Sequence, residues 1–271
     1  MPIKDILVAC DGSASAAHAL AHGTTLAKAI DAHLTGAVVH AISSVLVQLG
    51  PWITEPVEEV IRGQDDKRRA EIRAGFDQVT GGVTDHIHYL DLSGAPEAVL
   101  AETARLYDLL IVGGGEDTSG PRHFTANKHE LAAHCGGPLM VVPPSAKAAP
   151  VPDKIVLAWD GKPAASRALT AALPLMTAAR EVSVLTVGGD VGAHLDQVRT
   201  HLFRHGVTAE SVHLARGSGG IGATLLDECS RRAADLLVMG AYEHPKLAED
   251  VFGGVTDRIL REATLPVLMV H

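Results

Sequence analysis

The chain repeats one series of sequence landmarks, in the same order, in its two halves. The landmarks are an apolar run ending in Asp-Gly (Asp11, Asp160), an apolar run from aspartate to glycine (Asp108–Gly113, Asp235–Gly240) and a closing apolar run led by proline (Pro138–Val142, Pro266–Val270). A repeat that occupies a whole chain indicates two copies of one folding unit. The 271 residues are enough for two domains of roughly 130 residues each.

The segment between the repeats predicts a linker. Pro143 to Pro152 is rich in proline and alanine and has no hydrophobic periodicity. We therefore predict a first domain over residues 1–144, a linker over 145–152 and a second domain over 153–271. The first half carries about 21 extra residues, which fall between Ser43 and Arg73. In this region the pattern of Val57–Phe76 predicts an amphipathic helix.

Within each half, short apolar runs alternate with helical stretches. In the second half, strands are predicted near 154–159, 182–187, 211–215, 235–239 and 266–270, and helices near 163–178, 194–205, 221–232 and 254–263. Continuous apolar strands separated by helices are typical of a parallel sheet covered on both faces. The predicted fold class is therefore α/β, with two doubly wound sheets and a ligand crevice at the carboxyl ends of the strands.

Composition argues against several classes of partner. The net charge of −9, without any block of Lys and Arg, disfavours binding to nucleic acid or to anionic membranes. The apolar stretch from Gly36 to Leu49 is too short and too polar to span a bilayer, and the first residues show no signal-peptide pattern. Cys10, Cys135 and Cys229 are far apart and odd in number, which fits a reducing compartment. We expect a cytoplasmic protein.

Several of these landmarks together resemble the universal stress protein family. They are the Asp-Gly after the first strand, the fourth strand Asp235–Gly240, a glycine pair before a helix and the closing Pro266–Val270. The resemblance implies an adenine nucleotide alpha hydrolase-like fold, with five parallel strands in the order 3-2-1-4-5 in each half. In dimers of the family the last strands pair with one another. The closing strands Pro138–Val142 and Pro266–Val270 are therefore expected to meet and to form a pseudo-dimer.

Some family members bind ATP at a motif G-x-x-G, nine residues, then G-[S/T]. Here Gly240-Ala-Tyr-Glu243 is followed by nine residues and then by Gly253 and Gly254. The spacing is kept, although Glu243 replaces a glycine and Gly254 replaces Ser or Thr. Glycine lets backbone approach phosphates, and the N–H groups of a helix start bind them. Glu243 would bring a carboxylate near the phosphates, or would face a divalent cation such as Mg²⁺.

The resemblance assigns further residues of the second half, with Asp160 beside the nucleoside and the backbone of Val187 beside the adenine. The predicted nucleotide-site residues are Asp160, Val187, Gly240, Gly253, Gly254, Val255 and Thr256. Asp160 also has a purely local interpretation, because an aspartate at a strand–helix turn can cap the helix.

The first half departs further from the motif. It keeps Asp11 and Gly113, which are weaker candidates, and Asp11 has the same capping interpretation. Thr125 and Ala126 stand where the second half has its glycine pair. We therefore predict that a nucleotide binds in the second half.

Other chemistries find little support. No GxxxxGK[ST] or HExxH motif occurs, and no nucleophile is paired with a base, so we predict no catalytic and no metal-binding residues. Gly217–Gly222 matches G-x-G-x-x-G but follows the third strand of its half, which favours a tight βα turn over a dinucleotide site. His86 with His88, and His201 with His205, lack further ligands at zinc spacing.

The sequence thus predicts a stress-response protein that binds ATP, another adenine nucleotide or a similar small metabolite, with or without Mg²⁺. It would act as a sensor or regulator with an unidentified regulatory protein partner, and a homodimer of the tandem chain is compatible with this role. One alternative is a structural or interaction module with empty sites. Another is a weak ATPase or an adenylate-handling enzyme.

Overall fold

The computed structural model describes residues 2–41, 54–115, 123–147, 150–188, 192–241 and 254–271. The strands are β1 (Asp5–Ala9), β2 (His33–His40), β3 (Ile87–Ser93), β4 (Leu109–Gly113), β5 (Leu139–Val142), β6 (Lys154–Ala158), β7 (Glu181–Val187), β8 (Ala209–Leu214), β9 (Leu236–Gly240) and β10 (Val267–Val270). The helices are α1 (Ala14–Ile30), α3 (Glu55–Thr80), α4 (Pro96–Ala104), α5 (Lys128–His134), α6 (Pro163–Ala178), α7 (Gly192–Arg204), α8 (Gly220–Arg232) and α9 (Val255–Glu262). The alternation of strand and helix predicted for the second half is confirmed.

The strands form one sheet of ten, in the order β3-β2-β1-β4-β5-β10-β9-β6-β7-β8. Each half therefore has the predicted order 3-2-1-4-5, and all pairs within a half are parallel. The halves join through β5 and β10, which pair antiparallel with Leu268 opposite Met140. The predicted meeting of the closing strands within one chain is confirmed, and neither strand is left as an open edge.

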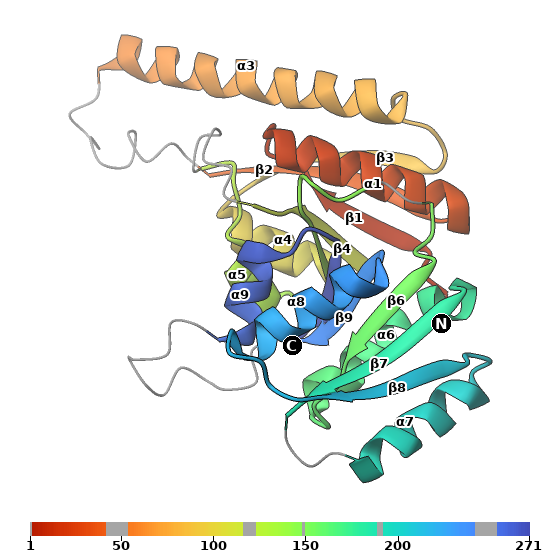
Figure 1. Cartoon of the computed structure of the whole chain (residues 1–271). Coiled ribbons are helices and arrows are strands. Elements are labelled where there is room, and N and C mark those ends of the chain that lie inside the picture. Colours follow the sequence, from red (N-terminus) through yellow and green to blue (C-terminus); the bar gives the residue numbers. More distant parts are fainter. Residues whose placement is uncertain (1, 42–53, 116–122, 148–149, 189–191, 242–253) are drawn as a thin grey trace.

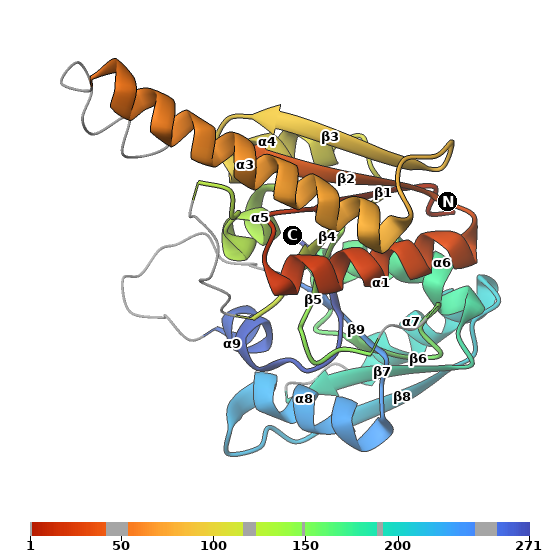
Figure 2. The same ribbon diagram turned by 90° about the horizontal axis from the view of Figure 1, so that it is seen from above.

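Helices cover both faces of the sheet, so the predicted doubly wound α/β class is confirmed (Figures 1 and 2). One apolar core lies between the sheet and α1, α3, α6 and α7, and a second lies between the sheet and α4, α5, α8 and α9. Alanine, valine and leucine dominate both cores. None of the helices in the described ranges is long and apolar enough to cross a membrane.

Helix α3 is the element that the extra residues of the first half build. It spans 26 residues, whereas α7, its counterpart in the second half, spans 13. Ile72 and Phe76, near its carboxyl end, are buried against the sheet, and its amino-terminal part extends past the sheet edge (Figure 2). Phe76 also packs against Tyr89 of β3, with ring centroids 5.0 Å apart. The amphipathic helix predicted over Val57–Phe76 is confirmed, and it spans Glu55–Thr80.

A buried histidine on α1 departs from the apolar character of the core. His22 is 3% exposed, and its Nδ1 atom has no hydrogen-bond partner. Burial and, to a smaller extent, the nearby His18 lower the pKa of His22 to about 4. The folded state therefore holds His22 in its neutral form at pH values where the unfolded chain is already protonated.

We predict that this histidine makes the protein acid-sensitive. Between an unfolded pKa of about 6.5 and the folded value of about 4, the unfolded state binds more protons, so stability falls as the pH falls. His22→Leu should therefore gain about 2 kcal/mol in free energy of unfolding, relative to wild type, between pH 7 and pH 4.5. Urea unfolding at both pH values measures this. His134→Leu, at an exposed site on α5, is the control, and an equal pH response of both variants would contradict the prediction.

Candidate functional site

In each half, an equivalent turn follows the first strand. In the first half, the backbone N–H of Ser13 donates to Asp11 Oδ1 at 2.9 Å, and in the second that of Lys162 donates to Asp160 Oδ1 at 3.1 Å. The glycine after each aspartate, Gly12 with φ of 78° and Gly161 with φ of 81°, adopts the left-handed conformation that the turn requires. The aspartates thus stabilise the local turn but do not cap the helices, because the N-cap residues are Ser13 and Lys162. They also stand where the strand order reverses.

The glycines at the ends of the fourth strands have a packing role. A Cβ atom on Gly240 would lie 2.7 Å from the backbone nitrogen of Ala165, and one on Gly113 would lie 2.7 Å from the carbonyl carbon of Ser15. Each strand end is therefore pressed against the first turn of α6 or α1. This contact accounts for both glycines without a ligand.

Helix α9 begins at Gly254, its N-cap residue, with φ of −63° and ψ of 163° and no side chain of its own to cap the helix. Gly254 is exposed, and a Cβ atom there would meet no atom of the described residues within 4 Å. Val255 is half-buried and Thr256 is buried behind it. Gly253 and Glu243 of the predicted motif lie outside the described residues.

The ends of β7 and β8 complete the second-half crevice. Val187 is half-buried and packs, with Ala158, against the core under α8 and α9. Arg216 follows β8, and its guanidinium lies 3.9 Å from where a Cβ of Gly220 would be, at the start of α8. Arg216 is exposed, and within the described ranges it makes no hydrogen bond or ion pair.

The equivalent crevice of the first half is nearly filled. A pocket of about 30 Å³ remains at the carboxyl ends of β1, β2 and β4, far below the several hundred Å³ that enclose a small organic ligand. Phe124, which is 3% exposed, and Ala126 form one wall of this pocket, and Asp11 and Cys10 lie opposite. Burial raises the pKa of the Cys10 thiol to about 12, so this cysteine is unreactive.

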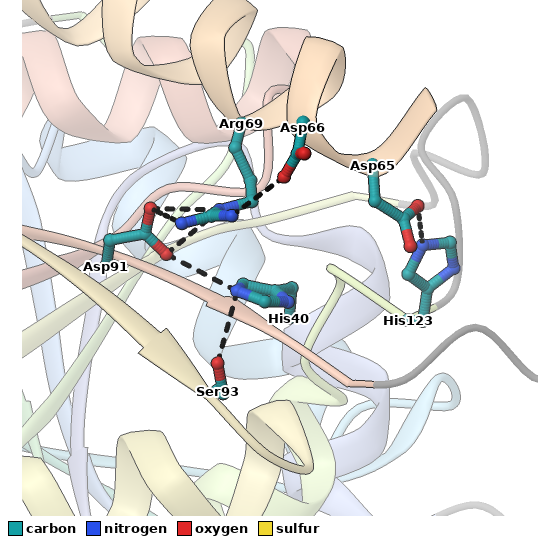
Figure 3. Close-up of polar contacts among 7 residues, drawn as sticks. All are labelled: His40, Asp65, Asp66, Arg69, Asp91, Ser93 and His123. Carbon is teal, nitrogen blue, oxygen red and sulfur yellow. Dashed lines mark hydrogen bonds and ion pairs between the residues drawn. The ribbon is translucent and has the colours of Figure 1, made fainter. Parts of the chain in front are cut away.

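Charged side chains of α3 form a polar network with residues at the ends of β2 and β3 (Figure 3). Arg69 donates from Nη2 and Nε to the Asp91 carboxylate at 2.6 and 2.9 Å, and from Nη1 to Asp66 at 3.0 Å. His40 Nε2 lies 3.4 Å from Asp91 Oδ1 and 3.3 Å from Ser93 Oγ. Because both contacts use the same imidazole nitrogen, His40 cannot pass a proton from Ser93 toward Asp91, and the three residues are not a catalytic triad.

Two more contacts tie α3 to the crevice. His123 Nε2 lies 2.9 Å from Asp65 Oδ1, which holds the segment carrying Phe124 against α3. Arg68 donates to the carbonyl oxygen of Gly12 at 3.0 Å. The sequence predicts α3 but none of these contacts. The density of oppositely charged residues along this helix is the feature that could have indicated them.

The remaining motifs have structural roles. Gly217 N–H donates to Thr224 Oγ1 at 3.1 Å and Gly220 N–H donates to the Gly217 carbonyl at 3.0 Å, which is the tight βα turn that was predicted. His33 Nδ1 and His88 Nε2 are 3.1 Å apart. Across the described parts of the chain, no group of three or more His, Cys, Asp or Glu side chains is arranged to hold a metal ion.

Comparison with known proteins identifies the fold family. The model of the Universal stress protein family matches residues 2–143 and 192–271. The chain belongs to the universal stress protein family. No curated protein sequence matches it.

Solved universal stress proteins support this fold over nearly the whole chain. One from Archaeoglobus fulgidus DSM 4304 is 14% identical, with a TM-score of 0.67, and the alignment covers 97% of each chain. A putative universal stress protein from Pseudomonas aeruginosa UCBPP-PA14 is 15% identical, with a TM-score of 0.55, over 99% of this chain and 93% of that one.

A universal stress protein solved in complex with cAMP is 23% identical, with a TM-score of 0.32, over 53% of this chain and 99% of its own.

The two halves of this universal stress protein differ in charge around their crevices. When the two halves are compared through the pairing of their strands, Val39 corresponds to Val187 and Leu92 corresponds to Leu214. Equivalent positions are then Ser13 and Lys162, Gly94 and Arg216, and Glu130 and Arg258. Arg258 is engaged with Glu262 at 2.9 Å. The difference is reversed at the start of the last helix, where Lys128 and His129 of the first half correspond to Thr256 and Asp257 of the second.

The packing role of Gly240 is directly testable. Gly240→Ala should lower the free energy of unfolding by about 1–3 kcal/mol without any ligand, because the added methyl group overlaps the first turn of α6. Gly75→Ala is the matched control, since it lies on α3 with open space around it and should stabilise by up to about 1 kcal/mol. Chemical denaturation of the ligand-free protein measures both. Wild-type stability for Gly240→Ala would contradict the contact.

Proposed function

We propose that this universal stress protein binds an adenine nucleotide or a similar small anionic metabolite in its second half, as a sensor or regulator rather than a catalyst. The observation that carries the proposal is the helix start at Gly254, where no atom of the described residues lies within 4 Å of an added Cβ atom. The N–H groups of a helix start and the positive end of the helix dipole favour a phosphate there.

Two further features support an anionic ligand. Lys162 and Arg216 stand at the rim of this crevice, where the first half has Ser13 and Gly94. The exposed Asp160 and the end of β7 at Val187 are placed at the same edge of the sheet, where the strand order reverses and ligands of open α/β sheets bind. A nucleoside between these elements would reach α9 with its phosphate.

The first half supports a structural role instead. Phe124 lines its crevice, where a pocket of only about 30 Å³ remains, and the contact between Asp65 and His123 joins the segment that carries Phe124 to α3. Opening this crevice for a nucleotide would expose a buried aromatic ring and separate several ion pairs. An interaction module with both sites empty is the second candidate function, and the filled first half is the observation that favours it.

A paired substitution tests the proposal. Gly254→Val should leave the fold intact, because no atom of the described residues lies within 4 Å of the added Cβ atom and the backbone angles suit valine. It should weaken nucleotide binding about tenfold or more, since the side chain would occupy the phosphate position and one charge-assisted hydrogen bond contributes about 1.5–3 kcal/mol. Calorimetric titration of ATP, AMP and cyclic AMP measures this.

Ala126→Val, at the equivalent position of the first half, is the control and should bind like wild type. An equal loss of affinity in both variants would contradict the asymmetry. Absence of binding by wild type, together with mass spectra of the denatured protein that show no co-purified nucleotide, would favour the module with empty sites.

A further inference from the structure

The antiparallel pairing of β5 and β10 brings the first turns of α5 and α9 together. His129 and Asp257 are equivalent positions of the two halves, since each lies the same number of residues before its closing proline, Pro138 or Pro266. In the folded chain His129 Nδ1 lies 3.9 Å from Asp257 Oδ1. A residue of the first half therefore touches the helix that begins the anion site proposed for the second.

Asp257 is the acidic residue in the first turn of α9. A carboxylate there interacts favourably with the helix dipole but repels any phosphate that binds at the same helix start. Two groups compensate its charge. Arg261 Nη2 lies 3.0 Å from Asp257 Oδ2, and His129 approaches Oδ1 from the other half. Only the histidine can change its charge near neutral pH.

We propose that His129 is a positioning residue for the second-half anion site, holding and neutralising the Asp257 carboxylate so that anion affinity depends on pH. This inference rests on the proposed function. It gives His129, a residue of the first half, a role in ligand binding by the second half.

The charges around His129 set the direction of the pH dependence. Burial lowers the pKa of His129, and Lys128 on α5 and Arg261 on α9 lower it further, against the opposing effect of Asp257 and Glu130. His129 is therefore neutral at pH 7.5 and gains its proton only below its ordinary range. A bound anion favours the protonated form, so by linkage the protonated form binds the anion more tightly. Affinity should rise as the pH falls.

Cyclic AMP is the probe, because its single phosphodiester charge does not change between pH 7.5 and pH 5.5. Titrated into the full chain, it should bind about 2- to 5-fold more tightly at pH 5.5, the size expected for one partly exposed ion pair. His129→Gln should lose this dependence. Asp257→Asn should bind more tightly at pH 7.5 and show little change with pH.

Two controls separate the explanations. His134→Gln, on the same helix and beside Glu130, should keep the wild-type pH profile. Adenosine, which carries no charge, should show no dependence on His129.

An unchanged pH profile in His129→Gln would overturn the inference and leave the proposed function standing. A loss of affinity that is equal at every pH would also overturn it, because it would assign His129 a role in folding only. If cyclic AMP binds at no pH the inference fails, while the proposed function is judged on the ATP and AMP titrations.

Discussion

The antiparallel pairing of β5 with β10 is the contact on which the rest of this molecule depends. It merges two five-stranded sheets into one sheet of ten and removes the two apolar edges that would otherwise invite aggregation. It also turns the halves in opposite directions, so the carboxyl ends of their strands face opposite ways. Finally, it places α5 beside α9, so that the first turn of α5 in the first half contacts the first turn of α9 in the second half.

Against this symmetric frame, one insertion makes the halves unequal. Helix α3 contacts the turn after β1 through Arg68, strand β3 through Arg69 and the segment before α5 through Asp65. The contact between Asp65 and His123 holds Phe124 in the crevice. The second half has a shorter helix in the same place and basic residues at its rim.

Much of this fold could be predicted from the sequence because its determinants are local and repeated. Continuous apolar strands between amphipathic helices indicate a parallel sheet, and the repeat of landmarks predicts the same strand order twice. The filling of the first crevice could not be predicted, since it depends on segments far apart in the sequence, such as Asp65 and His123. Gly240 shows a different limit. A glycine at a strand end fits both ligand approach and helix packing, and only the distance to Ala165 establishes the packing role.

The central claim is that binding is confined to one half, and a crystal structure of the chain grown with ATP tests it most directly. The account predicts electron density for the nucleotide beside Gly254 and Asp160, with Phe124 still in place in the first half. Density for a nucleotide between Asp11 and a displaced Phe124, or equal occupancy of both halves, would contradict it.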